Sequence, residues 1–248
     1  MDRYGLLGKN ISYSFSKGHF TKKFEQEEFN ATYENFDIPY ISEFPNVLIE
    51  KNLKGLNVTI PYKLEVIPYM DALHESAKNI GAVNVIKLQK NGKLIGYNSD
   101  YFGFKKSLEP LLKEHTKKAL ILGTGGASKA IAYALQTLNI EYTFVSRTPD
   151  TSQNRISYTD LTKEVIETHH LIINCSPIGT HPAIDQCPDI PYSLLTSKHI
   201  LYDLIYNPSE TLFLKKGKER GTVISNGLQM LVLQAEKSWE IWKSNDAI

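Results

Sequence analysis

Three closely spaced glycines, Gly123, Gly125 and Gly126, follow a short apolar run and precede a stretch with helical periodicity. The run, Ala119 to Leu122, is long enough for one buried strand, and Ala127 to Leu138 repeats apolar residues at helical spacing. Such a turn lets backbone approach a pyrophosphate closely, and the helix start offers unpaired N–H groups to it. The pattern therefore favours a dinucleotide site, with a plain turn between two elements as the alternative.

The residues after the next predicted strand, 142 to 145, bear on the choice of dinucleotide. In such folds an acidic residue here binds the ribose 2′-hydroxyl of NAD, whereas a basic residue accommodates the 2′-phosphate of NADP. Arg147 stands at this place between Ser146 and Thr148, and a guanidinium can bind a phosphate through two parallel hydrogen bonds. We expect NADP, while Asp150 keeps NAD open and a solvated loop arginine is the plainer interpretation.

A lysine that could transfer a proton lies in the stretch from Asn57 to Lys63. Thr59 ends a predicted strand there, and Pro61 directs the chain away from it. Polar groups at the carboxyl end of a strand face the crevice of an open α/β sheet, so Lys63 is a candidate proton donor to a carbonyl under reduction. Asp100 follows a later strand and could orient the amine. The alternatives are a solvated lysine at a helix start and a helix N-cap at Asp100.

Serines alternate through positions 12, 14 and 16, directly after the first predicted strand. Hydroxyls at alternating positions can line one wall of a site and hold a carboxylate by neutral hydrogen bonds. For Ser16, an equally good interpretation is the N-cap of the helix that we predict from 17 to 29.

Alternating strands and helices must position these groups. In roughly the first hundred residues the pattern predicts an α/β unit, with a helical piece from 63 to 69 and a hairpin of 83–88 and 94–97 around Asn91-Gly92. A second α/β unit begins at Lys118, and a long amphipathic helix follows from Leu228 to Trp242. We place the boundary along a helix predicted from 100 to 114 and expect the last helix to reach back to the first unit.

Composition limits the class of protein. The 248 residues carry a net charge of +1, which argues against a nucleic-acid or membrane-surface partner. No apolar run approaches the ~18–20 residues of a membrane span, and no signal-peptide pattern opens the chain. The two cysteines could form one disulfide but fit a reducing cytoplasm better, and the seven histidines show no metal-ligand spacing. We expect a cytoplasmic globular protein without a metal, a nucleic-acid partner or a membrane partner.

Taken in order, the motifs resemble those of the shikimate dehydrogenase family, and the resemblance runs from Tyr4 to about Ala235. Five positions depart from the family pattern: Lys17, Phe20, Ser146, Cys175 and Ser176. None of them falls on the lysine and aspartate discussed above. The matching segments are Ser14-Phe-Ser16, Asn57-Val-Thr-Ile-Pro-Tyr-Lys63, Gly81-Ala-Val-Asn84, Asn98-Ser-Asp100, Gly123-Thr-Gly-Gly-Ala-Ser128, Ser146-Arg-Thr148, Asn174-Cys-Ser-Pro-Ile-Gly179, Asp203-Leu-Ile-Tyr-Asn-Pro208 and Gly227-Leu-Gln-Met-Leu-Val-Leu-Gln234.

The resemblance implies an α/β protein of two domains with a cleft between them. Residues 1–102 would form the substrate-binding and catalytic α/β domain, with the C-terminal helix 228–248 packing back on it. Residues 103–227 would form a Rossmann-type NADP-binding domain with a parallel sheet. The resemblance leaves the oligomeric state open between a monomer and a homodimer.

The resemblance also implies the reversible NADPH-dependent reduction of 3-dehydroshikimate to shikimate, in the route to chorismate and the aromatic amino acids. Lys63 and Asp100 would be the catalytic pair. The substrate would be bound by Ser14, Ser16, Thr59, Asn84, Tyr206 and Gln234. NADP would be bound by Gly123, Thr124, Gly125, Gly126, Ala127, Ser128, Ser146, Arg147, Thr148 and Gly227. The alternatives are a quinate/shikimate dehydrogenase that uses NAD or both cofactors, a non-catalytic NADP-binding module, and a folate-linked dehydrogenase with a similar two-domain plan.

Overall fold

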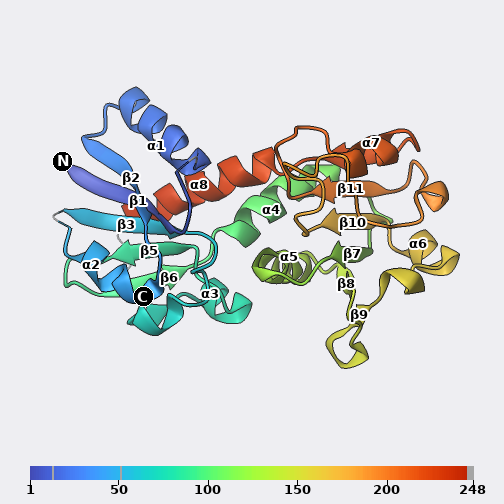
Figure 1. Cartoon of the computed structure of the whole chain (residues 1–248), viewed down its shortest axis with the longest axis horizontal. Coiled ribbons are helices and arrows are strands. Elements are labelled where there is room, and N and C mark those ends of the chain that lie inside the picture. The colour runs from blue at the N-terminus through green and yellow to red at the C-terminus, as the bar shows by residue number, and fades with distance from the viewer. Residues whose placement is uncertain (13, 51, 245–248) are drawn as a thin grey trace. The chain divides into compact units, whose positions relative to one another are not determined.

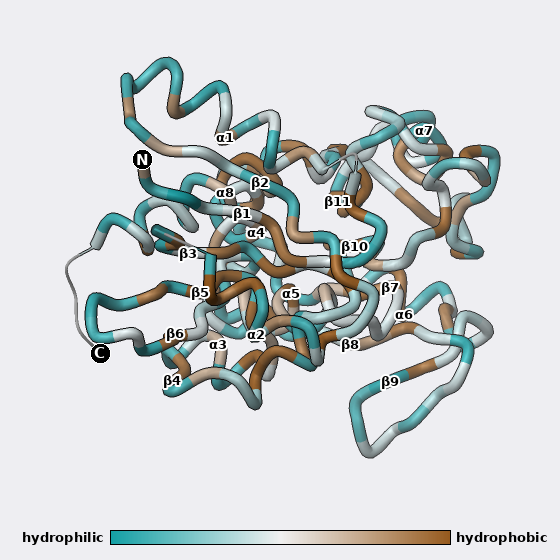
Figure 2. Tube along the Cα trace, turned by 60° about the vertical axis from the view of Figure 1, so that its left-hand side comes forward, coloured by the Kyte–Doolittle hydropathy of each residue, from teal (hydrophilic) through white to brown (hydrophobic). Residues whose placement is uncertain are grey.

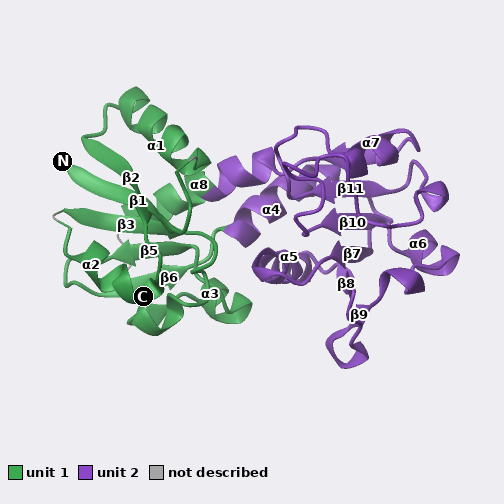
Figure 3. Ribbon diagram, viewed as in Figure 1, with its two compact units in different colours: residues 1–99, 235–248 green, residues 100–234 purple. Residues whose placement is uncertain are grey.

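The computed structural model describes residues 1–12, 14–50 and 52–244. Contacts divide the chain into two compact units (Figure 3): unit 1 comprises Met1–Ser99 and Ala235–Ile248, and unit 2 comprises Asp100–Gln234. Each unit is built on a six-stranded sheet, which confirms the predicted α/β fold of two domains. Within the described ranges, no helix has the length and hydropathy needed to cross a membrane.

The sheet of unit 1 is mixed, with the strand order β2-β1-β3-β5-β6-β4. β1 runs parallel to β2 and β3, whereas β5 is antiparallel to both β3 and β6. The β5–β6 hairpin turns through Gly92 at a φ of 83°, as its Asn-Gly sequence predicted. The strands are β1 (Asp2–Gly8), β2 (Ala31–Asp37), β3 (Leu53–Val58), β4 (Ala72–Leu73), β5 (Val85–Leu88) and β6 (Leu94–Tyr97).

Apolar clusters lie on both faces of this sheet, because successive side chains of a strand point to opposite faces. Leu6 belongs to one cluster and Leu7 to the other. The first cluster contains buried residues of α1 (Phe15–Gln26) and of the last part of α8 (Leu228–Lys243). The second contains residues of α2 (Phe44–Leu48) and α3 (Glu75–Ile80). Figure 2 colours α1 mostly hydrophilic, since its buried residues are only Ser16, Phe20 and Phe24.

The segment after β3 differs from the prediction of a helical piece from 63 to 69. It is a series of turns that ends in a 3₁₀ turn, Ile67–Tyr69. Pro61 and Pro68 bracket it and donate no backbone hydrogen bond. Val66 N bonds four residues back to the carbonyl of Tyr62, but the next donors reach back only three residues. Lys63 therefore lies in a turn rather than at the start of a helix.

The strands of the unit 2 sheet pair in parallel, with the order β12-β11-β10-β7-β8-β9. Figure 1 labels all of them except β12. The chain adds β8 and β9 on one side of β7 and then β10, β11 and β12 on the other, so the direction of winding reverses between β7 and β10. This is the strand order of a Rossmann fold. The strands are β7 (Lys118–Leu122), β8 (Glu141–Val145), β9 (Arg155–Ile156), β10 (Leu171–Asn174), β11 (Ile200–Asp203) and β12 (Val223–Ser225).

The helices of unit 2 are α4 (Asp100–Leu108), α5 (Gly126–Thr137), α6 (Lys163–Thr168), α7 (Leu212–Lys218) and the beginning of α8. α4 is shorter than the helix predicted from 100 to 114, because a 3₁₀ turn at Glu109–Leu111, which contains Pro110, replaces its last part. α4 and α8 pack closely at Gly103, where an added Cβ would lie 2.5 Å from the carbonyl oxygen of Met230.

Three histidine rings lie next to one another, edge-on or tilted rather than stacked, at the amino ends of neighbouring strands in unit 2. His115, His170 and His199 precede β7, β10 and β11. The ring centroids of His115 and His170 lie 4.9 Å apart, and those of His170 and His199 lie 5.5 Å apart. His199 is buried and donates through Nε2 to the carbonyl of Ile166 at 3.0 Å. No group of three or more His, Cys, Asp or Glu side chains in the described part of the chain could hold a metal ion.

Candidate functional site

The glycine turn lies at the point where the winding of the unit 2 sheet reverses. Gly123 follows β7 and adopts a φ of 104°, a conformation that L side chains rarely take. Its N–H donates to the carbonyl of Val145 at 2.9 Å. An added Cβ would lie 3.3 Å from the backbone N of Ser176, which follows β10. In an open α/β sheet, this crevice at the carboxyl ends of the strands is the usual position of a ligand.

Backbone is open to a ligand at the start of α5. Gly125 is the N-cap at a φ of −71°, and no side chain caps this helix. A Cβ built on Gly125 or Gly126 would meet nothing within 4 Å, and Thr124 is exposed beside them. Ser128 instead points inward and donates to the carbonyl of Gly125 at 2.6 Å, which holds the turn. These features fit a pyrophosphate, which would meet free N–H groups and the positive end of the helix dipole.

The loop after β8 presents Arg147 to solvent. The hydroxyl of Ser146 donates to the carbonyl of Thr148 at 2.8 Å and accepts from its N–H at 3.0 Å, so this hydroxyl serves the loop. The acid that could favour NAD is engaged elsewhere: Asp150 pairs with Arg155 at 3.1 Å and accepts from Ser152. The hydrogen bond from the Ser152 hydroxyl is the main cause that lowers the pKa of Asp150. The loop therefore offers an open guanidinium and an occupied carboxylate, which suits a 2′-phosphate.

The loop after β11 meets the start of α8. Gly227 N donates to the carbonyl of Ile205 at 3.1 Å, and a Cβ at Gly227 would overlap the backbone of Leu204. Tyr206 directly follows Ile205 in the chain and is 41% exposed. Asp203, at the end of β11, accepts hydrogen bonds from Thr211 at 2.6 Å and Asn174 at 3.0 Å.

Burial raises the pKa of Asp203 to about 6. The hydrogen bonds from Thr211, Ile205 and Asn174 act in the opposite direction, since they favour the charged carboxylate. Asp203 thus ties the ends of β10 and β11 together beside the turn.

In unit 1, the two serines of the first loop have different roles. Ser14 is the N-cap of α1, because its hydroxyl oxygen accepts from Lys17 N at 3.3 Å, and it also donates to Asn35 Oδ1 at 3.1 Å. Ser16 is the second residue of α1 and is buried, and its side chain acts to lower the pKa of Tyr33 against the larger effect of burial, which raises it. The suggestion that Ser16 caps the helix is therefore wrong. Tyr13 lies outside the described residues.

Hydrogen bonds join the segments that carry Lys63, Asn84 and Ser99. The carbonyl of Lys63 accepts from Val83 N at 2.8 Å. The adjacent side chain of Asn84 is 2% exposed, donates to Ser99 Oγ at 3.1 Å and accepts from Ser99 N at 2.6 Å. Thr59 follows β3 and donates through its N–H to the carbonyl of Leu7 at 2.9 Å. The loop ends of unit 1 thus hold Lys63 and Ser99 in one connected cluster.

One acidic and one amide side chain of the predicted site, Asp100 and Gln234, belong to unit 2. Asp100, the residue after Ser99, is 8% exposed and is the first residue of α4, so it is an acid in the first turn rather than the N-cap. Gln234 lies on α8, is 8% exposed, and donates through Nε2 to the carbonyl of Leu231 at 3.0 Å. An added Cβ at Gly103 of α4 would lie 2.9 Å from Gln234 N, so Gln234 is close to α4.

Sequence reasoning gave no role to four buried polar residues, which are Tyr33, Asn57, Ser99 and Ser238. Asn57 stood inside a recognised segment, but its side chain was not assigned. A usable signal for Ser238 was its place on the apolar side of the C-terminal helix, where a serine is unexpected.

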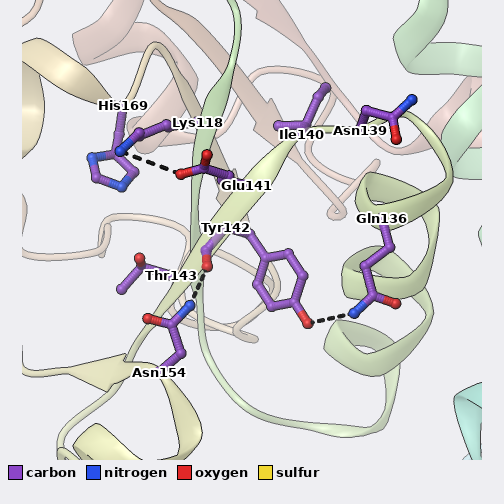
Figure 4. A pocket seen from close by; sticks show the side chains of 9 residues that line it. All are labelled: Lys118, Gln136, Asn139, Ile140, Glu141, Tyr142, Thr143, Asn154 and His169. Atoms are coloured by element: carbon purple, nitrogen blue, oxygen red, sulfur yellow. Dashed lines mark hydrogen bonds and ion pairs between the residues drawn. The ribbon is translucent and has the colours of Figure 1, made fainter.

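A hollow of about 700 Å³ lies elsewhere on unit 2 (Figure 4). It opens at the starts of β7 and β8, where Lys118 and Glu141 form an ion pair at 3.3 Å, and Gln136 donates to the hydroxyl of Tyr142 at 3.1 Å. The glycine turn follows the opposite, carboxyl end of β7, so this hollow is separate from the candidate dinucleotide site. The lining residues are Lys118, Gln136, Asn139, Ile140, Glu141, Tyr142, Thr143, Asn154 and His169.

Comparison with known proteins finds extensive similarity. A family model described as the shikimate dehydrogenase substrate binding domain matches residues 6–86. A shikimate dehydrogenase (NADP(+)) of Desulforamulus reducens is 34% identical over 259 residues, covering 96% of this chain and 88% of that protein. The one from Carboxydothermus hydrogenoformans is 37% identical over 254 residues, covering 96% and 90%. The crystal structure of shikimate 5-dehydrogenase from Thermus thermophilus with NADP(H) and shikimate has a TM-score of 0.86 and 28% identity, covering 98% of this chain and 94% of that one.

Proposed function

The chain belongs to the shikimate dehydrogenase family, and from this premise we propose that it catalyses the reversible NADPH-dependent reduction of 3-dehydroshikimate to shikimate, in the route to chorismate and the aromatic amino acids. One observation carries the proposal: an open glycine turn occupies the reversal point of a Rossmann-order sheet. That is where a dinucleotide binds in such sheets. The substrate class follows from the relatives that match along nearly the whole chain.

NADP would be held by the turn and by the loop after β8. The open backbone at Gly125 and Gly126 would receive the pyrophosphate, Arg147 the 2′-phosphate, and Gly227 would lie beside the nicotinamide. Ser128 and Ser146 would shape these loops through the hydrogen bonds that they make. Bound NADPH supplies the hydride. The remaining residues of this proposed site are Gly123, Thr124, Ala127 and Thr148.

Lys63 would act as the general acid in the reduction. Its ammonium gives a proton to the carbonyl oxygen of the substrate, and in the reverse direction the amine takes the proton from the hydroxyl. Asp100 would accept a hydrogen bond from the amine and hold its direction. The connections from Lys63 through Val83 and Asn84 to Ser99 support this pairing, because Asp100 is the next residue of the chain. Proton transfer of this kind contributes about 10²–10⁴-fold to the rate.

The remaining polar side chains of the proposed site would bind the substrate. The hydroxyls of Ser14 and Ser16 suit the carboxylate, and Tyr206 would lie near the same group. The further contacts would come from Thr59, Asn84 and Gln234. In this proposal residues 1–102 with the helix 228–248 form the substrate-binding part, and residues 103–227 form the NADP-binding part. We further propose a cytoplasmic enzyme that works as a monomer or a homodimer.

A direct assay tests the proposal. The purified protein is mixed with shikimate and NADP, and the absorbance of reduced nicotinamide is followed. We expect turnover, with a higher kcat/KM for NADP than for NAD and for shikimate than for quinate. NADP binding without turnover would instead identify a non-catalytic module. Equal kcat/KM values with NAD, together with oxidation of quinate, would identify a quinate/shikimate dehydrogenase.

A further inference from the structure

A chain of buried polar side chains runs through unit 1 between two of the residues proposed to bind substrate. It starts at Tyr33 on β2, whose pKa is raised mainly by burial and lowered by a smaller effect of the Ser16 side chain on α1. Tyr33 donates to Asn57 Oδ1 on β3 at 2.8 Å. Asn57 Nδ2 donates to Ser238 Oγ on α8 at 2.8 Å. These bonds link one strand on each side of β1 to α8.

From Ser238 the chain continues to Asn84. The hydroxyls of Ser238 and Ser99 lie 3.2 Å apart, and Asn84 Nδ2 donates to Ser99 Oγ at 3.1 Å. Asn57 Nδ2 also reaches the carbonyl of Asn84 at 3.3 Å. Ser16 beside one end is 9% exposed and Asn84 at the other is 2% exposed, while the four residues between them are 0–4% exposed.

Burial fixes how this chain can be hydrogen-bonded. Burial is the main cause that raises the pKa of Tyr33, so its phenol keeps its proton and donates to Asn57 at every working pH. Because Tyr33 occupies Oδ1 of Asn57, the amide group of Asn57 faces Ser238. Water cannot easily replace a lost partner at such positions, so removal of the Tyr33 hydroxyl takes from Asn57 Oδ1 the donor that fixes the orientation of this amide.

We propose that Tyr33, Asn57 and Ser238 are positioning residues for substrate binding, which act by holding Ser16 and Asn84 in fixed relative positions. The C-terminal helix then contributes to the site through Ser238 as well as through its apolar packing. The inference rests on the proposed function, because Ser16 and Asn84 matter only if they meet the substrate. It adds residues to which neither the sequence motifs nor the family resemblance gave a role.

The test compares Tyr33→Phe and Ser238→Ala with the full-length wild type. Tyr33→Phe removes a single hydroxyl and should raise the KM for shikimate about tenfold, with kcat within about twofold. Ser238→Ala should raise the same KM and also lower kcat, because Ser99 directly precedes Asp100. The KM for NADP should stay within about twofold in both variants, since the chain of hydrogen bonds lies wholly in unit 1.

Ser107→Ala is the matched control. Ser107 is a buried serine of unit 2 that bonds to the carbonyl of Phe104 at 2.9 Å and the hydroxyl of Tyr202 at 2.6 Å. Its loss should lower the melting temperature without changing the KM for shikimate. If Tyr33→Phe and Ser238→Ala behave like this control, the network serves stability alone and the proposal is overturned.

Two further measurements separate this inference from the proposed function. In a double-mutant cycle, Tyr33→Phe combined with Ser16→Ala should raise the KM little more than the larger single effect, whereas additive effects would contradict action through Ser16. Calorimetric titration with shikimate gives a Kd without turnover. Wild type that binds shikimate but does not oxidise it would overturn the enzyme activity and still leave the network testable by Kd. Wild type that does not bind shikimate would overturn both.

Discussion

Lys63 is the side chain on which the proposed chemistry depends most. Lys63→Ala should lower kcat by at least about 10²-fold with the Kd for NADPH nearly unchanged, because it removes the general acid and leaves the glycine turn intact. Steady-state kinetics and a titration with NADPH measure the two quantities. Lys90→Ala, at the exposed turn of the β5–β6 hairpin, is the control for loss of a lysine. A normal kcat in Lys63→Ala would remove Lys63 from the reaction.

Arg147 should decide the preference for NADP. Arg147→Ala should lower kcat/KM with NADP by about 10–100-fold and change the value with NAD little, since a charged hydrogen-bond pair to the 2′-phosphate is lost. The ratio of the two kcat/KM values is the measurement. Arg220→Ala removes the same charge from an exposed site after α7 and should leave the ratio unchanged. An unchanged ratio in Arg147→Ala would place the 2′-phosphate elsewhere.

The serines of the first loop should anchor substrate rather than take part in catalysis. The double variant Ser14→Ala with Ser16→Ala should raise the KM for shikimate more than it lowers kcat. It should also lose about 1 kcal/mol of stability, because Ser14 caps α1. Thr162→Ala removes the N-cap of α6 in unit 2 and controls for that loss. A fall in kcat with an unchanged KM would contradict the anchoring role.

At the scale of single residues, the sequence identified which side chains belong to the candidate site better than it identified what each of them does locally. It singled out both serines, but the N-cap is Ser14, because α1 begins two residues earlier than predicted. The network through Tyr33, Asn57 and Ser238 was beyond reach, since Asn57 and Ser238 are 181 positions apart in the chain. No local periodicity carries information about such a contact, which depends on how a distant helix packs on the sheet.

At the scale of elements, a substitution in the glycine turn allows the effect on folding stability to be measured separately from the effect on NADP binding. Gly125→Ala should keep or slightly raise the melting temperature, because a φ of −71° and the open space around it accommodate a methyl group. The same methyl should weaken NADP binding, since it would occupy the place of the pyrophosphate. Differential scanning fluorimetry and a binding titration measure the two effects. Unchanged NADP affinity would show that the ligand does not approach this turn.

Gly123→Ala is the contrasting variant. A φ of 104° strains any L side chain, and the added Cβ lies 3.3 Å from Ser176 N. It should therefore lower the melting temperature, at a cost of about 1 kcal/mol or more. A stability equal to wild type would mean that the turn relaxes into another conformation.

The predictability of each element followed its local signals. The β5–β6 hairpin was predictable because Asn91-Gly92 has a defined turn chemistry between two apolar runs. The strand, turn and helix around Gly123 were equally clear. The helical piece from 63 to 69 failed, because its apolar spacing suggested a helix while Pro61 and Pro68 removed the donors that a helix needs. Strand order is not local information, so the order of the unit 1 sheet required the structure.

At the scale of the whole molecule, the cluster of His115, His170 and His199 should make stability depend on pH. Burial, followed by repulsion from His199, His115 and Lys198, lowers the pKa of His170 below its ordinary 6.5. The unfolded chain therefore takes up the proton first as the pH falls through about 6.5. The stability that His170 contributes is present above that pH and is lost below it.

The melting temperature should accordingly fall between about pH 7.5 and pH 5.5, and less so in His170→Gln. His181→Gln, in an exposed loop, is the control. Asp203 has the opposite effect on stability as the pH falls. Its pKa is raised to about 6, so its charge destabilises the folded state above that pH, and protonation removes this destabilisation below it. Asp203→Asn should therefore steepen the fall. Equal pH profiles for wild type and His170→Gln would show that this histidine cluster does not govern acid sensitivity.

α8 begins in unit 2 and ends in unit 1. Its last part brings Trp239 and Trp242 into the cluster around Tyr4, with the rings of Tyr4 and Trp242 4.9 Å apart. Neither half of the molecule can therefore be excised by a single cut in the coding sequence. A fragment that ends at Ser99 would lack both indoles. A premature stop codon after Gln234 would likewise remove the aromatic packing of unit 1, although the mutation lies near the 3′ end of the gene.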